Sequence, residues 1–192
     1  MTPFDTMTAR AALIDGANVD TDQIIPARFL RKPRSDGYQT FLFHDMPAIR
    51  DAIRGAGVVL AGDNFGCGSS REGAVYALVD AGVRCVIAPS FGDIFAGNAG
   101  KNGLLLLALP EGQTAALRAA LACGGAVTVD LPGQCVTGPG GITLSFEIDP
   151  FRKRMLLEGL DDIGMTLSHA AAMADWAAQD GVARPWVAPP GS

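Results

Sequence analysis

The chain lacks several features that would assign it to common functional classes. Its 192 residues carry a net charge of −5 with a pI near 4.9, and they contain no cluster of Lys and Arg of the kind that lines a nucleic-acid groove. The longest apolar run, residues 104–109, has the length of a strand and not of a membrane span. The first ten residues, MTPFDTMTAR, include no apolar secretory core. We therefore expect a cytoplasmic protein that binds neither nucleic acid nor membrane.

Cysteine is also scarce, and the residues present do not form a metal-binding pattern. The four cysteines include no Cys-x-x-Cys pair and share no ligand-like spacing; they are Cys67, Cys85, Cys123 and Cys135. Because an iron–sulfur cluster needs several thiolates at a suitable spacing, we expect this chain to bind no metal by itself. In the cytosol the four thiols are expected to stay reduced.

The residues that are abundant suit a single domain with many turns. Hydrophobic residues make up 48% of the chain, and 24 glycines and 12 prolines punctuate the apolar runs. A chain of this length buries enough apolar surface for one core, and it has no internal repeat. We predict one domain over residues 1–180 and an irregular C-terminal tail over residues 181–192, which contains three prolines.

The clearest structural pattern is a strand, a glycine-rich loop, a helix and a second strand. Residues 57–62 and 83–88 are apolar runs of strand length, and residues 71–81 place apolar side chains on one side of a helix. This order predicts a right-handed crossover between parallel strands. Residues 104–109 are expected to add a third strand.

The rest of the chain predicts helices and antiparallel strands. Residues 126–131 and 142–148 alternate between apolar and polar on either side of a Gly/Pro-rich turn region. Helices are expected over residues 111–123, 150–160 and 166–179, and residues 47–54 form a weakly amphipathic stretch. The sequence therefore predicts an α/β fold with parallel and antiparallel strands.

The loop between the first strand of the crossover and its helix carries the residues best suited to binding a ligand or to catalysis. It reads Asn64-Phe-Gly-Cys-Gly-Ser-Ser-Arg-Glu72 and leads into a helix, whose first N–H groups and dipole favour an anion. Gly66 and Gly68 permit a ligand to approach the backbone. Ser69 and Ser70 add hydroxyls, and the planar guanidinium of Arg71 can hold a carboxylate through two hydrogen bonds. These residues form a candidate carboxylate or phosphate site.

A simpler interpretation of part of this loop is helix capping. Ser69 and Glu72 have the spacing of a capping box, in which Ser69 is the N-cap and Glu72 reaches back from the third helical position. Capping accounts for those two residues but not for the glycines, Ser70 and Arg71. Dinucleotide and nucleophile-elbow patterns do not match, because both require Gly where this loop has other residues. A P-loop requires an earlier Gly, which is missing, and Ser or Thr after Gly100-Lys101, where Asn102 stands.

Four segments together resemble the aconitase swivelling domain, in the form found in bacterial 3-isopropylmalate dehydratase small subunits. The first is the glycine-rich loop, and the second is Asn18-Val-Asp-Thr-Asp-Gln-Ile-Ile-Pro26 with Arg28-Phe-Leu30. The third is Ile87-Ala-Pro-Ser-Phe-Gly-Asp-Ile-Phe95 followed by Gly97-Asn98, and the fourth is Leu156 to Leu167. Four motifs in the same order, spread over residues 10–178, make the resemblance specific.

The resemblance implies a fold, a partner and a reaction. The fold is a swivelling domain with a mixed sheet core flanked by helices. The partner is a large subunit that carries a [4Fe–4S] cluster, and this chain is inactive without it. The reaction is the isomerisation of 2-isopropylmalate to 3-isopropylmalate by dehydration and rehydration, a hydro-lyase step of leucine biosynthesis.

The resemblance also implies roles for individual residues. Ser69 is the base that takes the carbon-bound proton of the substrate, and Asp22 reaches the shared catalytic site. Ser70 and Arg71 bind a substrate carboxylate, and Thr21 is a further substrate contact.

The resemblance implies that the segment beginning Arg28-Phe-Leu-Arg-Lys32 selects the substrate. Leu30 is expected to face an apolar substrate side chain, and either Arg28 or Arg31 a carboxylate. One departure concerns Gly73, because the family usually has His at this position; a second is Ala99-Gly100 in place of Ser-Phe. Two alternatives therefore stay open: a related hydro-lyase subunit for another substituted malate, and a non-catalytic carboxylate-binding module. For Cys67 a small structural role is expected.

Overall fold

The computed structural model describes residues 1–184 and 186 of the chain. These residues form two units, one over residues 1–159 and one from residue 160 onward, and each is considered by itself. The first unit contains the sheet and helices α1–α6, and the second contains α7 and α8. Among the described residues, no helix is long and apolar enough to cross a bilayer.

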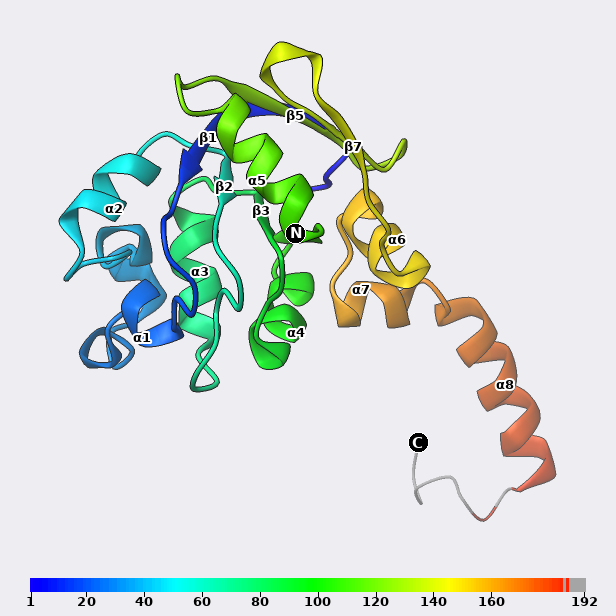
Figure 1. The fold of residues 1–192 in the computed structure, drawn as a ribbon. Coiled ribbons are helices and arrows are strands. Elements are labelled where there is room, and N and C mark those ends of the chain that lie inside the picture. The colour runs from blue at the N-terminus through cyan, green and yellow to red at the C-terminus, as the bar shows by residue number, and fades with distance from the viewer. Residues whose placement is uncertain (185, 187–192) are drawn as a thin grey trace. The chain divides into compact units, whose positions relative to one another are not determined.

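The first unit is built around one seven-stranded sheet in the order β4-β3-β2-β1-β5-β6-β7 (Figure 1). The strands β1, β2, β3 and β4 are parallel, and β5, β6 and β7 continue the sheet antiparallel from the other edge of β1. The strand bounds are β1 Thr6–Leu13, β2 Val58–Leu60, β3 Cys85–Ala88, β4 Leu105–Ala108, β5 Ala126–Asp130, β6 Cys135–Thr137 and β7 Thr143–Ser145.

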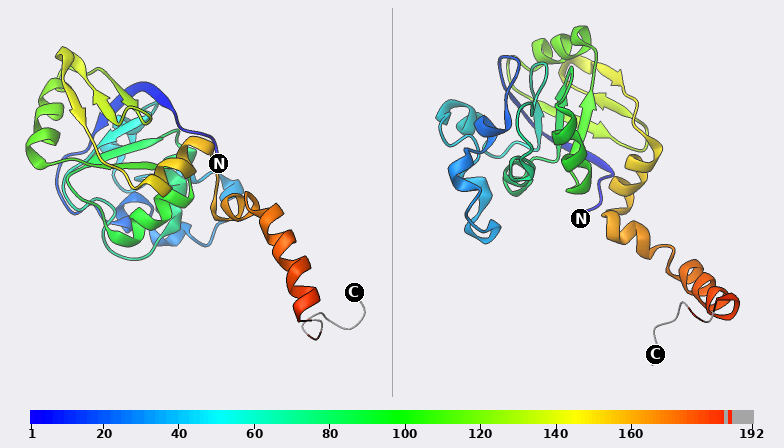
Figure 2. Two further views of the ribbon diagram at one scale, coloured as in Figure 1. Left: turned by 90° about the vertical axis from the view of Figure 1, so that its right-hand side faces the viewer. Right: turned by 90° about the horizontal axis from the view of Figure 1, so that it is seen from below.

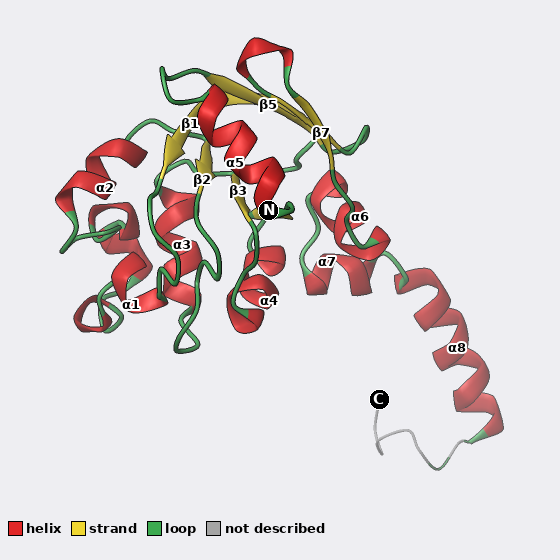
Figure 3. Cartoon of the chain, viewed as in Figure 1, coloured by secondary structure: helices red, strands yellow, loops and turns green. Residues whose placement is uncertain are grey.

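Helices lie on both faces of the parallel half of this sheet (Figures 2 and 3). The α-helices are α1 Thr21–Ile24, α2 Pro47–Ile53, α3 Glu72–Asp80, α4 Asp93–Lys101, α5 Glu111–Ala120, α6 Pro150–Glu158, α7 Asp162–Leu167 and α8 Ala170–Ala183. Four short 3-10 turns cover Ala27–Phe29, Arg34–Asp36, Tyr38–Thr40 and Pro139–Gly141. The α/β class with a mixed sheet flanked by helices is confirmed.

Alternation along the strands divides the core into two apolar clusters. Val59 and Val86 point to the face covered by α2, α3 and α4, whereas Leu60 and Ile87 point to the face covered by α5 and α6. The inner strands are therefore apolar on both faces, as is typical of a parallel sheet with two covered sides. In β5 only Val127 and Val129 are buried, and they pack in the cluster that α5 and α6 cover, as is typical of an antiparallel strand with one face on the core.

The sequence pattern does not predict β1, β6 or α4. In β1 only Ala12 is fully buried, since polar residues such as Thr8 and Arg10 interrupt the apolar run. Helix α4 contains Gly97 and Gly100, which lower helix propensity, and it is held by the buried ring of Phe95. Strand β6 is three residues long and lies in the Gly/Pro-rich region. Packing against neighbours outweighs local propensity in all three.

The single helix predicted over residues 166–179 is wrong, because the chain forms α7 and then restarts as α8. The hydroxyl of Ser168 donates to the carbonyl of Met165 at 2.6 Å and so satisfies an acceptor at the end of α7. Asp161 caps the start of α7 by accepting from the Gly164 N–H at 2.7 Å. Helix α8 runs to Ala183, three residues into the predicted tail, and residues 185 and 187–192 lie outside the described residues.

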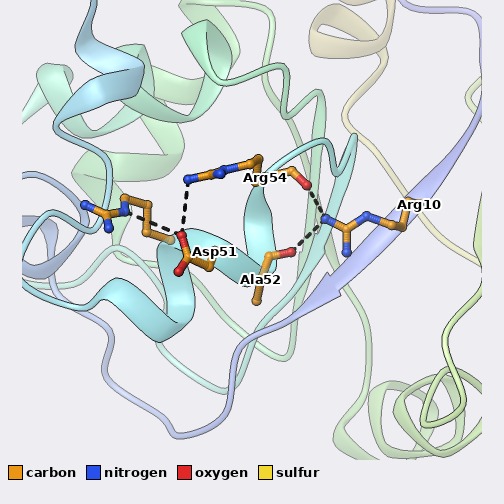
Figure 4. A network of polar contacts seen from close by, with 5 residues as sticks. Arg10, Asp51, Ala52 and Arg54 are labelled. Carbon is orange, nitrogen blue, oxygen red and sulfur yellow. Dashed lines mark hydrogen bonds and ion pairs between the residues drawn. The ribbon is translucent and has the colours of Figure 1, made fainter.

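Arg10 joins β1 to the end of helix α2 (Figure 4). Its guanidinium donates to the carbonyl of Ala52 at 2.8 Å and to that of Arg54 at 2.5 Å. Ala52 lies in the last turn of α2 and Arg54 is its C-cap, so both carbonyls belong to the helix C-terminus. A cation there interacts favourably with the helix dipole. Arg54 in turn pairs with Asp51 at 3.3 Å. The contact holds α2 against the centre of the sheet.

Candidate active-site loop

The glycine-rich loop lies at the carboxyl ends of the parallel strands. It follows β2 and is held on both sides by backbone hydrogen bonds to the segments that follow β1 and β3. On one side the Gly66 N–H donates to Val19 O at 2.7 Å and the Thr21 N–H donates to Cys67 O at 3.0 Å. On the other side the Phe65 N–H donates to Ser90 O at 3.1 Å. The loop is therefore an extension of the sheet with a fixed backbone.

Polar side chains fasten the start of this loop. The Ser90 hydroxyl donates to Asp63 Oδ1 at 2.5 Å and accepts from the Asn64 N–H at 2.9 Å. The Asn64 side chain donates to Asn18 Oδ1 at 2.8 Å. Both asparagines have positive φ, 58° for Asn18 and 54° for Asn64, a conformation that Asn adopts more readily than most residues. The sequence pattern does not predict these anchors, although Asp63 and Ser90 lie just after the apolar runs of β2 and β3.

Thr21 supports the backbone of Ser69. Its hydroxyl donates to the Ser69 carbonyl at 2.8 Å, and its side chain is only 2% exposed. The preceding residue, Asp20, caps α1 by accepting from the Gln23 N–H at 2.7 Å, and Gln23 Oε1 accepts from the Asp20 N–H at 2.9 Å. This capping box fixes the helix turn from which Thr21 reaches the loop.

Asp22 and Arg71 meet across the same junction. Arg71 Nε donates to Asp22 Oδ1 at 3.2 Å, and the two side chains are 31% and 49% exposed. Such a half-exposed pair contributes little to stability. Its effect is positional, because it brings together two candidate residues that are 49 positions apart in the sequence. No other hydrogen bond of the Arg71 guanidinium occurs in the described part of the chain.

The predicted capping box at the start of α3 does not form. The helix begins at Glu72 with Arg71 as its N-cap, and the cap has no side-chain hydrogen bond. Glu72 instead accepts from the Asn102 amide at 2.9 Å. Ser69 lies too far before the first helical residue to cap it, because Thr21 holds its carbonyl in the extended loop.

The failure of that capping box leaves the loop hydroxyls available. Ser69 and Ser70 are both exposed, and neither hydroxyl has a hydrogen-bond partner within the residues that the structure describes. Both are therefore open to solvent in the two residues before Arg71, whose Nε donates to Asp22. The loop presents two hydroxyls and one cation on a rigid backbone, which suits the binding of a carboxylate.

The structure separates the two arginines of the selection segment. Arg28 forms a two-pronged ion pair with Asp45, in which Nη1 donates to Oδ2 at 2.8 Å. The hydrogen bonds from Arg28 lower the pKa of the Asp45 carboxyl and raise the pKa of Arg28. Arg31 is exposed and forms no ion pair or hydrogen bond with any described residue. Leu30 is half-buried and packs on the apolar cluster beside α3.

A shallow groove runs beside the loop. Its volume is about 390 Å³, and it is lined by residues of the loop and of the turn into α4, including Asn64, Cys67, Phe91 and Ile94. Cys67 is half-buried here and is not joined by other ligand side chains. Among residues 1–184 and 186, no three His, Cys, Asp or Glu side chains gather as a metal site.

Comparisons with known proteins agree with this architecture. The family profile of the aconitase C-terminal domain matches residues 43–112, and that of the LeuD family, described as LeuD_N, matches residues 116–150. A crystal structure of 3-isopropylmalate dehydratase from Methanocaldococcus jannaschii superposes with a TM-score of 0.71 at 28% identity, covering 88% of this chain and 98% of the other.

Relatives of similar length share nearly half of their residues with this chain. The 3-isopropylmalate dehydratase small subunit of Jannaschia sp. is 47% identical, and that of Dinoroseobacter shibae is 45% identical, each over 97% of this chain and 100% of the relative. The corresponding subunit of Shewanella baltica is 46% identical over 93% of this chain and 97% of the relative. On fold, loop and sequence, the chain belongs to the 3-isopropylmalate dehydratase small subunit family.

Proposed function

We propose that this chain is the small subunit of a heteromeric hydro-lyase that interconverts 2-isopropylmalate and 3-isopropylmalate through an alkene. Near-full-length identity to small subunits of that name supports the reaction. One observation about the site carries the proposal furthest: Ser69, Ser70 and Arg71 are presented together on a loop whose backbone is fixed from both sides.

Proton transfer is assigned to Ser69. Its hydroxyl is exposed, has no competing partner among the described residues, and lies just before the first turn of α3. The positive end of that helix dipole and the nearby guanidinium favour the alkoxide that a base requires. In the forward step the Ser69 alkoxide takes the carbon-bound proton, the C–H electron pair forms the alkene, and the hydroxyl leaves the adjacent carbon as hydroxide. The proton and the hydroxide together make the one water that is lost. Rehydration with the opposite regiochemistry completes the isomerisation.

Carboxylate binding is assigned to Ser70 and Arg71, with Asp22 as the residue that orients the guanidinium. Because Asp22 accepts from Nε, the two terminal nitrogens of Arg71 remain for a bidentate carboxylate contact. Thr21 contributes by holding the Ser69 carbonyl, since its own hydroxyl is buried and already donates. For the second carboxylate we favour Arg31 over Arg28, because Asp45 occupies the fork of Arg28.

The [4Fe–4S] cluster is assigned to the large subunit. The cysteines of this chain do not fit a cluster site, because Cys85 is buried in the sheet while Cys67 and Cys135 are half-buried in separate elements. A large subunit is implied by the family, whose members are named as small subunits. Bound to the large subunit, the cluster would supply a Lewis acid for the departing hydroxyl.

A second candidate is a hydro-lyase subunit for another substituted malate. The observation that favours it is Gly73, which stands where the family usually has His, two residues after Arg71. A change this close to the carboxylate-binding residues affects the choice of substrate and not the type of reaction.

The test is reconstitution with the cognate large subunit under anaerobic conditions. Alkene formation from 3-isopropylmalate is followed by ultraviolet absorbance for wild type, Ser69→Ala and the control Ser145→Ala, which alters an exposed hydroxyl on β7. Activity that requires both subunits, is retained in the control and falls by about a thousandfold or more in Ser69→Ala is expected. A stable complex without activity on this substrate would favour the second candidate, and full activity of Ser69→Ala would remove Ser69 as the base.

A further inference from the structure

A pocket lies between the ends of helices α2 and α3, and we call it the α2–α3 pocket. Its volume is about 360 Å³. Its apolar lining includes the buried side chains of Leu42 and Ile53 and the half-buried Ala81, and its charged lining consists of Arg50 and Arg54. Pockets of this size that combine apolar walls with a few polar groups are typical of sites for small organic molecules.

Helix α3 separates the α2–α3 pocket from the glycine-rich loop. Arg71 is the N-cap of this nine-residue helix, and Ala81 is its C-cap. At 1.5 Å per residue the helix is about 13 Å long. Asp80, in its last turn, is paired with Arg34, so this end of α3 brings no unpaired carboxylate to the pocket. The α2–α3 pocket is therefore distinct from the proposed active site.

Arg50 has donors that the described residues leave unused. Its Nε is buried and donates to no acceptor among residues 1–184 and 186, and Asp51 Oδ1 lies 3.8 Å away, beyond hydrogen-bond distance. Arg84 is the contrasting case, because its Nε is also buried but its Nη2 donates to the Thr2 carbonyl at 2.8 Å. A buried donor without an acceptor is unfavourable and rare. An acceptor on a ligand would therefore be stabilised beside Arg50.

The charges at this end of α2 favour an anion. Arg50 and Arg54 both line the pocket, and Asp51 pairs with Arg54 at 3.3 Å. Arg10 adds a third cation and donates to the carbonyls of Ala52 and Arg54 (Figure 4). These hydrogen bonds occupy carbonyl groups that would otherwise repel an anion at a helix C-terminus. Three arginines against one aspartate give a local positive charge in a chain whose net charge is −5.

We infer that the α2–α3 pocket binds a small carboxylate that carries a short apolar chain. The carboxylate accepts from Arg50 and Arg54, because guanidinium N–H groups match the two oxygens of a carboxylate. The chain covers Leu42, Ile53 and Ala81. A neutral apolar molecule leaves Arg50 without an acceptor, and an inorganic anion leaves the apolar lining uncovered.

The experiment titrates the full chain, labelled at its isoleucine δ1 methyl groups, with hexanoate at constant ionic strength in NMR. Ile53 reports the α2–α3 pocket, and Ile94 reports the groove beside the glycine-rich loop. We expect the Ile53 methyl to shift with a Kd of about 1 mM, and hexanamide and inorganic phosphate to bind at least about fivefold more weakly. Arg50→Met should weaken hexanoate binding by about tenfold, whereas the control Arg154→Met, which removes a half-exposed arginine of α6, should not.

The other outcomes overturn the inference. Equal affinity for hexanamide would show that the arginines play no part, and equal affinity for phosphate would show the same of the apolar lining. A shift at Ile94 without one at Ile53 would assign the carboxylate to the groove beside the loop. Unchanged affinity in Arg50→Met would remove the proposed contact, and Arg54→Met with the wild-type methyl shifts decides if that variant does not fold. Loss of binding on assembly with the large subunit would assign the pocket to the subunit interface.

Discussion

The hydroxyl of Thr21 is the most direct link between helix α1 and the proposed catalytic serine, and its removal tests the importance of loop geometry. Thr21→Val keeps the shape of the side chain and deletes only the donor, which bonds to the Ser69 carbonyl at 2.8 Å. The site is 2% exposed, so water cannot reach the deleted position freely. The change therefore weakens the support of Ser69 without opening a cavity.

The structure sets the expected magnitudes. Losing a buried neutral hydrogen bond of this length costs about 1–2 kcal/mol of unfolding free energy. For a chain of this size that corresponds to a fall in Tm of roughly 2–6 °C. The effect on catalysis should be larger in relative terms, because a small displacement of a proton-transfer group lowers kcat by about ten- to a hundredfold. KM should change little, since the Arg71 side chain keeps its partner Asp22.

A matched control exists elsewhere in the chain. Thr114 is 5% exposed, and its hydroxyl donates to the Glu111 carbonyl at 2.8 Å, a threonine-to-carbonyl bond of equal length that is local to α5. We expect Thr114→Val to lower Tm by a similar amount and to leave kcat unchanged, and Thr21→Ser to retain activity. The assay combines thermal denaturation of the small subunit with steady-state kinetics of the assembled pair. Equal kcat values for Thr21→Val and Thr114→Val would refute the positional role of Thr21.

Three further predictions follow from side chains with defined partners. Asp22→Asn should raise KM for 3-isopropylmalate by about tenfold while changing unfolding free energy by less than about 1 kcal/mol, because the ion pair it weakens is half-exposed; a KM equal to that of wild type would contradict its orienting role. Arg31→Met should raise KM for 3-isopropylmalate, whereas Arg28→Met should not; the reverse pattern would assign the carboxylate contact to Arg28. In Arg28→Met, NMR titration should show the pKa of Asp45 rising toward its usual value, because the hydrogen bonds that lower it are gone. Burial raises the pKa of the Cys85 thiol, so iodoacetamide at pH 8 should label the exposed Cys123 and leave Cys85 unmodified in the folded chain, as measured by mass spectrometry; labelling of both at one rate would mean that the sheet opens readily.

Local sequence patterns predict the strands and helices that have a continuous apolar run or a clear helical periodicity. The apolar runs around residues 58–60, 85–88 and 105–108 predict β2, β3 and β4, since a strand buried on both faces reads as an unbroken apolar segment. The helix after the glycine-rich loop is predicted to within one residue at each end. By contrast β1, the strand at the centre of the sheet, escapes prediction because its alternating polar residues are stabilised by pairing with both β2 and β5.

The sequence by itself determined the chemistry that the loop can offer, and the tertiary structure decided how the loop is used. Glycines, two serines and an arginine between a strand and a helix predict a site for a carboxylate or a phosphate through residue type and spacing alone. The hydrogen bonds of Thr21 to Ser69, of Arg71 to Asp22 and of Arg28 to Asp45 join segments 17 to 49 residues apart. The absence of a capping box at Ser69 and the packing of Leu30 on Gly73 depend on the same contacts. Such contacts form only when the parallel strands bring the ends of separate segments to one edge of the sheet, and no local pattern encodes that encounter.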